Sequence, residues 1–269
     1  RARKAESPSR EVKLACFSVS HFYDVACCAF FHFLQLLKRK NSKSMQNPPH
    51  VLTVDAAGTL IRPWPSVGAV YGKTARAFGI SVQDEEVDAR FYEIFGKIQK
   101  DQKATMGEEK DFWRKVVLEV FQAFSDGREL DPLFEELWEL FARGDHWRLA
   151  EGASETLAEL NSRGYRLAVL SNNDSRLRSV LADLEIDRIF DEIFISSELG
   201  VEKPDLEIFR KVERRFNKNP SHFLHLGDSH SRDFLGAKKA GWSALLFGRP
   251  VIEQDQITSF KELLEILPR

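Results

Sequence analysis

Cysteine is scarce in this 269-residue chain, and the few cysteines are unevenly placed. All three of them, Cys16, Cys27 and Cys28, lie in the first 28 residues. From residue 45 onward there is none. This excludes a disulfide framework, and also a zinc site built on cysteine, from most of the chain.

A basic excess is also missing from the chain as a whole. The formal net charge is −2, and 43% of the residues are hydrophobic and 30% charged, which is typical of a globular protein. We therefore expect no nucleic acid as a partner. The charge is nevertheless asymmetric, because residues 1–44 carry +6 and the remainder carries −8.

No long uninterrupted apolar run is present either. Residues 14–37 are rich in Phe and Cys, but several polar residues interrupt them. They make a poor membrane span, which needs about 20 apolar residues, and a poor secretory signal. We expect residues 1–44 to be a basic extension, disordered or mis-assigned, and the functional protein to start at Met45 and to be cytoplasmic. The alternative is a basic membrane-associating helix, and N-terminal sequencing of the native protein distinguishes the two.

Strand-like and helix-like patterns alternate from residue 45 onward. Short apolar runs predict strands, and helical spacing of apolar residues predicts helices. The predicted strands are 50–54, 166–170, 189–195, 222–226 and 243–247, and the predicted helices are 154–163, 174–184, 205–216, 233–240 and 257–267. Asp174 is expected to cap the helix that follows it. The alternation predicts an α/β fold, a Rossmann-like parallel sheet with helices on both faces.

A long helical segment interrupts this alternation after the first strand. Residues 66–147 contain no comparable buried strand, and their apolar residues repeat at the spacing of amphipathic helices. We expect a core domain formed by residues 45–65 and 148–269. The inserted residues 66–147 are then a helical cap domain over the strand ends, and their apolar stripes are interpreted as the core of a helix bundle.

Polar residues fall at or just beyond the ends of the predicted strands. They are Asp55, Ser171 with Asn172, Lys203, and Asp228 with Asp233. The C-terminal ends of parallel strands share one edge of a sheet, so these groups are expected to converge. Carboxylates, a hydroxyl, amides and a cation suit phosphoryl transfer, which depends on positioning and charge stabilisation. Asp55 and Asp228 suit Mg²⁺, and Asp55 suits nucleophilic attack on phosphorus.

These motifs, in this order, resemble the four motifs of the haloacid dehalogenase superfamily. The matching segments are Asp55-Ala56-Ala57-Gly58-Thr59-Leu60, Ser171-Asn172, Lys203-Pro204, and Gly227-Asp228 with Asp233. Each motif alone is weak, but four in order are a strong signal. The stretches 111–121 and 171–177 also resemble one particular branch of the superfamily. The resemblance implies a Rossmann-like core, a helical type-1 cap, Mg²⁺ and usually phosphatase activity.

The resemblance also implies roles for single residues. Asp55 matches the nucleophile, Lys203 the lysine of the third motif, and Ser171 the hydroxyl that binds phosphate. The implied metal ligands are Asp55, the backbone carbonyl of Ala57, Asp228 and Asp233, the last either directly or as support. Further candidates for binding substrate or phosphate are Asn172, Asn173 and Arg62, although a place in the proline-flanked hinge before the cap explains Arg62 almost as well.

Ala57 departs from the phosphatase pattern. The superfamily's phosphatases carry a second aspartate at this position, which acts as general acid and base. Such catalysis is worth about 10²–10⁴-fold, so its loss is a handicap for alkyl phosphates and less so for acyl or enol phosphates. We therefore predict a Mg²⁺-dependent phosphatase that acts on a small phosphorylated metabolite through an aspartyl-phosphate at Asp55.

Three alternatives remain open. A 2-haloacid dehalogenase also lacks the second aspartate, but it attacks carbon and needs no metal. A phosphonoacetaldehyde hydrolase carries alanine at this position and needs a cap lysine, for which Lys97, Lys100 and Lys103 are loose candidates. A catalytically weak protein would keep the fold and bind a metal or a partner. In each case we expect a monomer or a homodimer.

Overall fold

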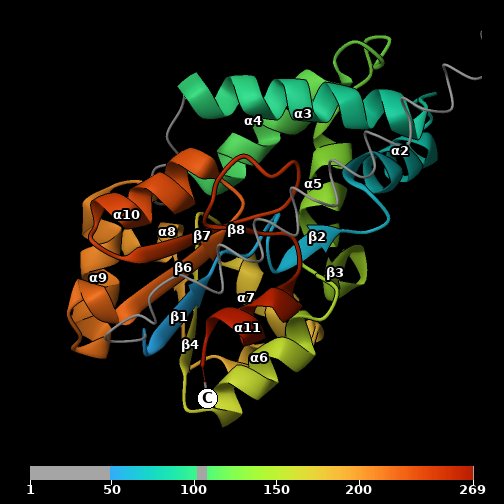
Figure 1. Ribbon diagram of the computed structural model, residues 1–269. Coiled ribbons are helices and arrows are strands. Elements are labelled where there is room, and N and C mark those ends of the chain that lie inside the picture. The colour runs from blue at the N-terminus through green and yellow to red at the C-terminus, as the bar shows by residue number, and fades with distance from the viewer. Residues whose placement is uncertain (1–48, 102–107, 269) are drawn as a thin grey trace, which may run out of the picture. The chain divides into compact units, whose positions relative to one another are not determined.

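The structure, a computed structural model, describes residues 49–101 and 108–268 (Figure 1). The expectations for residues 1–44, and for Met45 as the start of the functional protein, lie outside these residues. Within the described ranges, no helix combines the length and the apolar character that crossing a lipid bilayer requires.

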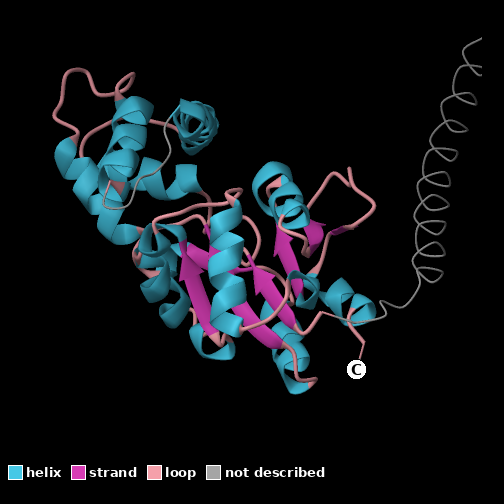
Figure 2. Ribbon diagram, turned by 90° about the vertical axis from the view of Figure 1, so that its left-hand side faces the viewer, coloured by secondary structure: helices cyan, strands magenta, loops and turns pink. Residues whose placement is uncertain are grey.

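Six parallel strands form the main sheet, in the order β5-β4-β1-β6-β7-β8. The strands are magenta in Figure 2. Their bounds are β1 Val51–Val54, β4 Arg166–Ser171, β5 Glu192–Ile195, β6 Phe223–Gly227, β7 Ser243–Phe247 and β8 Gln256–Ile257. All neighbouring pairs are parallel. The predicted Rossmann-like parallel sheet is therefore confirmed, and each of its five predicted strands is present.

Helices cover both faces of this sheet, as predicted. They are α6 Ala153–Ser162, α7 Arg176–Asp183, α8 Ser196–Leu199, α9 Leu206–Phe216, α10 Gly236–Lys239 and α11 Leu263–Ile266. The helices α6, α7 and α11 share one apolar cluster with the central strands, and α9 and α10 share another. Coverage on both faces explains why the strands are almost continuously apolar in sequence.

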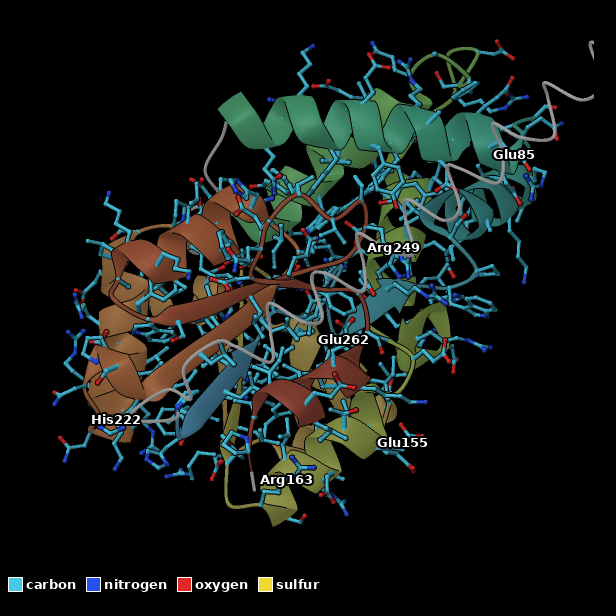
Figure 3. The ribbon with its side chains drawn as sticks, viewed as in Figure 1. Glu85, Glu155, Arg163, His222, Arg249 and Glu262 are labelled. Atoms are coloured by element: carbon cyan, nitrogen blue, oxygen red, sulfur yellow. The ribbon has the colours of Figure 1, made fainter. Side chains whose placement is uncertain are left out.

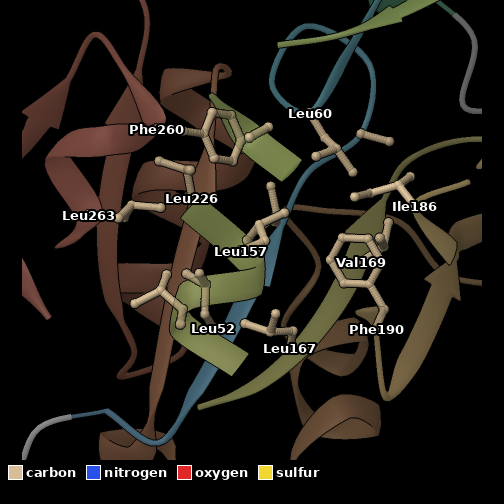
Figure 4. Close-up of a cluster of buried hydrophobic side chains, with 14 of the residues drawn as sticks. Leu52, Leu60, Leu157, Leu167, Val169, Ile186, Phe190, Leu226, Phe260 and Leu263 are labelled. Carbon is tan, nitrogen blue, oxygen red and sulfur yellow. The ribbon is translucent and has the colours of Figure 1, made fainter. Parts of the chain in front are cut away.

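Alternate residues of each strand enter opposite clusters. Leu52 and Leu226 lie in the cluster beside α6 and α11 (Figure 4), whereas Val51 lies in the cluster beside α9. This is the period of two that a strand imposes on its side chains. Two polar residues break the apolar pattern: Thr53 and His225 are partners in the register of β1 and β6, and both are fully buried.

A second group of helices lies in sequence between the two strands of a small antiparallel sheet. The strands are β2 Ile61–Pro63 and β3 Trp147–Leu149, and the helices are α2 Val67–Ala77, α3 Asp84–Asp101, α4 Glu109–Phe121 and α5 Asp131–Leu140. These helices bury an apolar cluster of their own, drawn from residues 67–137. The structure is helical where the spacing predicts helices; the strands β2 and β3 were not predicted, because three residues are too short to show a period. The domain boundaries themselves stay a prediction.

The C-terminal segment corrects the prediction of a helix over 257–267. Residues 256–257 pair with β7 as strand β8, and a 3₁₀ turn, Phe260–Glu262, precedes the short α11. Ser259 and Glu262 form a capping box that starts the helix there. Arg163 then donates to the carbonyls of Leu264 and Leu267 (Figure 3 labels Arg163 and Glu262). Because β8 and the capping box occupy residues 256–262, the α-helix begins only at Leu263.

The helix predicted over 233–240 also differs. Residues His230–Leu235 form a π-helical turn, and only Gly236–Lys239 are α-helical. Ser229 begins the turn and its hydroxyl accepts from the Arg232 backbone N–H. A widened turn of this kind is common at functional sites, and it is the turn that carries Asp233.

Candidate active site

Three site residues meet because their strands are neighbours. β1 lies between β4 and β6, and Asp55 follows β1, Ser171 ends β4 and Asp228 follows β6. All three line one cavity of about 620 Å³, together with Lys203 and Asp233. The structure thus brings together groups that lie up to 178 residues apart in sequence, at the edge where open α/β sheets place their sites.

The ammonium group of Lys203 has three acceptors. Its Nζ donates to Asp55 Oδ1 at 2.8 Å and to the Leu170 carbonyl at 2.6 Å, and it lies 2.6 Å from Asp233 Oδ1. Its side chain is 1% exposed. A lysine offers three N–H donors, and a buried charge is tolerated when it is paired and hydrogen-bonded. Both carboxylates raise the pKa of Lys203 against the opposing effect of burial, so the group is charged.

Asn172 fixes the backbone of this lysine. Its side-chain amide donates to the Lys203 carbonyl and accepts from the Lys203 backbone N–H, each at 2.8 Å. The sequence assigns Asn172 to substrate or phosphate binding. In the structure the amide oxygen and one N–H bond the backbone of Lys203, and Asn172 also lines the cavity. Its part in binding stays a prediction.

A chain of buried polar groups supports Asp233. Its Oδ2 accepts from the Ser229 backbone N–H, and its Oδ1 lies 3.1 Å from His225 Nε2. The second ring nitrogen, Nδ1, lies 2.8 Å from the Thr53 hydroxyl. Burial lowers the pKa of His225, so its ring is neutral. Because the carboxylate only accepts, Nε2 carries the proton and Nδ1 accepts from Thr53.

Sequence reasoning missed His225 and Thr53. Each is a lone polar residue within an apolar strand. Such a residue usually forms a hydrogen bond with a neighbouring group and has no part in a functional site. The signal that was available is their position, since both precede a strand end that carries an acidic residue.

The acidic residues of the site differ in their affinity for protons. Burial raises the pKa of Asp55 to about 6, Lys203 opposes this, and the charges of Asp233 and Asp228 add to it. Burial also raises the pKa of Asp228. Burial acts on Asp233 in the same direction, but Lys203 and His225 outweigh it and hold its pKa well below the usual range. Asp55 is therefore the carboxylate that gains most from a further cation.

The donor set fits a divalent cation. Asp55, Asp228 and Asp233 each offer a carboxylate oxygen, and these oxygens lie within 4.8 Å of one another. Three carboxylates against the single ammonium of Lys203 leave two negative charges when all are ionised. Mg²⁺ prefers such oxygen donors and completes its shell with water and substrate phosphate.

Two glycines allow the acidic groups to approach. Gly58 has φ +95°, and a Cβ there would lie 2.5 Å from Asp228 Oδ2. A Cβ on Gly227 would overlap the carboxyl group of Asp233. Both positions therefore require glycine for packing, and at Gly58 the left-handed backbone requires it as well.

The remaining predicted residues also line the cavity. Ala57 lines it and is exposed, which leaves room for a longer side chain. Arg62 is an exposed residue of β2, with its guanidinium 5.9 Å from the Trp64 ring centre. The Asn173 side chain accepts from the Asp174 backbone N–H. Ser171 is buried at the end of β4.

The loop after β4 also holds two tryptophans of the inserted helices. Arg176 forms a two-point ion pair with Asp174, at 2.8 Å for each contact. The guanidinium lies 3.4 Å from the Trp138 ring centre and donates to the Trp138 carbonyl. Trp113 donates its indole N–H to Asp174 at 3.2 Å. The Asp174 side chain accepts from the Arg176 backbone N–H, but the N-cap of α7 is Ser175 and not Asp174 as expected. The sequence did not reveal this tie between α4, α5 and the core.

With this geometry in view, comparison with known proteins decides the family. A family model described as haloacid dehalogenase-like hydrolase matches residues 49–241. The chain belongs to this family. The resemblance seen in its four motifs is therefore confirmed, and the chain is a hydrolase of the haloacid dehalogenase superfamily.

Individual relatives agree with this assignment. Haloacid dehalogenase-like hydrolase domain-containing protein 3 of Mus musculus is 33% identical over 203 residues, which cover 73% of this chain and 80% of the mouse protein. This is the branch that the stretches 111–121 and 171–177 resemble. The glyceraldehyde 3-phosphate phosphatase of Methanothermobacter thermautotrophicus is 38% identical over 104 residues, or 38% of this chain and 46% of that enzyme.

A solved structure shares the fold of this hydrolase. The haloacid dehalogenase-type hydrolase YfnB of Bacillus subtilis, solved bound to magnesium, superposes with a TM-score of 0.69 at 18% identity. The match covers 82% of this chain and 99% of that one.

The raised pKa of Asp55 predicts a pH-dependent stability. In the unfolded chain its carboxyl titrates near 3.8 and in the folded protein at about 6, so the folded state binds more protons in this window and loses stability as pH rises through it. Asp55→Asn removes this titration. In EDTA, the free energy of unfolding of the variant minus that of the wild type should be about 2 kcal/mol larger at pH 7.5 than at pH 4.5. Urea denaturation at both pH values measures this difference in stability. The same difference at both pH values would contradict the raised pKa of Asp55.

The tie between Asp174 and Arg176 predicts a burial-dependent loss of stability. Arg176→Met leaves the buried Asp174 carboxylate without its cation, so the free energy of unfolding should fall by about 3–5 kcal/mol. Arg178→Met is the matched control, because Arg178 forms the same two-point pair with Glu198 but its side chain is 49% exposed, against 16% for Arg176. The control should lose less than about 1 kcal/mol. Equal losses in urea denaturation would show that burial does not set the strength of the pair.

Proposed function

We propose that this hydrolase is a Mg²⁺-dependent phosphatase that acts on a small phosphorylated metabolite through an aspartyl-phosphate at Asp55. The supporting observation is the Asp55 carboxylate, held by Lys203 inside a cluster of three carboxylates at the strand ends. The archaeal relative named as a glyceraldehyde 3-phosphate phosphatase supports the substrate class. We further propose a cytoplasmic monomer or homodimer, with no nucleic-acid partner.

Mg²⁺ is the cation that this site suits best. Asp55, Asp228 and Asp233 would hold it, and the carbonyl of Ala57, two residues after Asp55, would add a further oxygen. The bound ion would neutralise charge on the carboxylates and on the phosphate of the substrate. The structural neighbour from Bacillus subtilis was solved with magnesium, which supports the choice.

The side chains divide the reaction among them. Asp55 provides the attacking oxygen: its bond to phosphorus forms as the bond from phosphorus to the leaving oxygen breaks, and that oxygen takes a proton from solvent. One difficult displacement thus becomes two easier ones. Lys203 orients the Asp55 carboxylate and offsets charge near the transferring group. Ser171 offers its hydroxyl to a phosphate oxygen. Water then attacks the phosphorus of the adduct, which frees inorganic phosphate and restores the Asp55 carboxylate.

The alternatives receive less support. A dehalogenase needs no metal, and it would leave the cluster of Asp228 and Asp233 without a cation to hold. A phosphonatase needs a lysine from the cap in its cavity. Lys97 is exposed on α3 and does not line the cavity, and the side chains of Lys100 and Lys103 lie outside the described residues.

Asp55→Asn tests the nucleophile. The amide cannot form the acyl phosphate, so Mg²⁺-dependent hydrolysis of p-nitrophenyl phosphate and acetyl phosphate should fall at least about 10³-fold, the scale of losing a nucleophile. Asp205→Asn is the matched control, because Asp205 caps α9 from an exposed position and asparagine caps equally well. The control should keep full activity. Wild-type turnover by Asp55→Asn, measured as released phosphate, would refute the assignment.

Ala57→Asp tests the missing proton donor. A carboxyl at this position would protonate the leaving group, so kcat/KM for alkyl phosphates should rise by about 10²–10⁴-fold, with a much smaller change for p-nitrophenyl phosphate. Ala57→Asn has nearly the same shape and no acidic proton, and should give no such rise. If both variants behave like the wild type, protonation of the leaving group does not limit the reaction.

A further inference from the structure

The cavity reaches from Asp55 into the inserted helices, and its wall there is aromatic. Its volume of about 620 Å³ lies in the range of small-molecule sites. Aromatic side chains from each of the helices α2–α5 and from β3 line it, among them Tyr71, Phe91, Phe95, Trp113, Trp138 and Trp147. This wall of the cavity is therefore suited to an apolar, flat group.

The rings of this wall are fixed before any substrate arrives. Phe95 stacks on Phe91 with ring centres 5.6 Å apart and planes 10° apart, and on Trp113 at 5.6 Å and 13°. The indole N–H of Trp113 is bonded to the buried Asp174. Side chains that are already ordered cost less to immobilise on binding. Phe95 and Trp113 are each only partly buried, so ring surface remains accessible.

The wall that the described residues of α2–α5 contribute to the cavity carries no positive charge. Among the described residues of α2–α5 that line the cavity there is no lysine, arginine or histidine, and Glu109 adds a carboxylate. Arg176, at the boundary, is engaged by Asp174 and by Trp138. Among these described residues a second phosphate or a carboxylate of a substrate would find no partner cation, so this wall favours an uncharged substrate body.

The leaving group follows from Ala57. With no acid beside Asp55, the leaving oxygen departs as an anion. A phenol has a pKa of about 10, whereas water, which aliphatic alcohols resemble, has one of about 15.7. A phenolate leaves without a proton far more readily than an alkoxide.

We propose that the substrate is the monophosphate ester of an uncharged phenol, with its ring against Phe95 and Trp113 and its phosphate at Asp55. The proposal rests on the phosphatase function proposed above and names its substrate class. Two independent observations support it: the aromatic wall favours an aromatic substrate body, and Ala57 favours a leaving group that needs no proton.

The reaction balances without another reactant than water. An Asp55 carboxylate oxygen forms a bond to phosphorus as the bond from phosphorus to the phenolic oxygen breaks. The electron pair of that bond stays on the phenolate, which takes a proton from solvent. Water then cleaves the aspartyl-phosphate to inorganic phosphate and the Asp55 carboxylate.

Three test substrates distinguish the effect of the substrate body from the effect of the leaving group. 1-Naphthyl phosphate has both features, cyclohexyl phosphate has an apolar body but a poor leaving group, and acetyl phosphate has a good leaving group but no ring. With Mg²⁺ and the full chain, we expect kcat/KM for 1-naphthyl phosphate to exceed that for cyclohexyl phosphate by about 10³-fold or more. Its KM should lie about tenfold below that of acetyl phosphate.

Phe95→Leu tests the wall directly. It keeps an apolar side chain but removes the ring, so KM for 1-naphthyl phosphate should rise about tenfold, and by several-fold more than KM for acetyl phosphate, which has no ring to contact the wall. Phe78→Leu is the matched control, because Phe78 is 41% exposed at the end of α2 and does not line the cavity. It should change neither substrate.

The outcomes separate the two proposals. If acetyl phosphate is hydrolysed through Asp55 but 1-naphthyl phosphate is no better than cyclohexyl phosphate, or if Phe95→Leu leaves KM unchanged, the substrate class is wrong and the phosphatase stands. If no phosphate is turned over while the fold is intact, both proposals fall. The expected order of substrates, together with the Phe95→Leu effect, supports both.

Discussion

The buried ammonium group of Lys203 determines how the sheet edge is arranged. A charge that is 1% exposed needs partners, and the partners come from three elements: Asp55 after β1, the Leu170 carbonyl of β4 and Asp233 of the π-helical turn. Each element is therefore constrained to end close to the same point. The backbone of Lys203 is constrained in turn by Asn172, so the lysine has little freedom to follow a displaced partner.

The same ammonium affects its two carboxylates unequally. Asp233 also receives hydrogen bonds from His225 and from the Ser229 backbone, and its pKa is held well below the usual range. Asp55 lacks this support, and burial raises its pKa to about 6. The fold therefore satisfies the supporting carboxylate and leaves the proposed nucleophile under-stabilised. Such a site lowers the stability of the protein without ligands, and binding of a cation and a phosphate would stabilise it. Functional sites often reduce stability in this way.

Much of this site is readable in the sequence, and what is not readable has a physical reason. Asp55, Ser171 and Asp228 could be placed together, because the ends of parallel strands share an edge whatever the loops between them do. Thr53 and His225 could not be recognised, because a single polar residue in an apolar strand has no pattern until the register of β1 and β6 is known. The bonds from Trp113 and Trp138 depend on how the inserted helices contact the core, which no local pattern encodes.

The loop after β4 links the edge of the sheet to the inserted helices. Within six residues it carries Ser171 at the phosphate end and Arg176, which holds Trp138, with Asp174 between them holding Trp113. Any movement of α4 or α5 away from the core must either break these buried contacts or move the loop. Breaking them would leave the Asp174 carboxylate short of partners in a site where it is 5% exposed, which is costly. Moving the loop would displace Ser171. The position of the aromatic wall and the position of the Ser171 hydroxyl are therefore coupled. If Ser171 binds phosphate as proposed, a ring that fits the wall also favours the geometry in which phosphate meets Asp55.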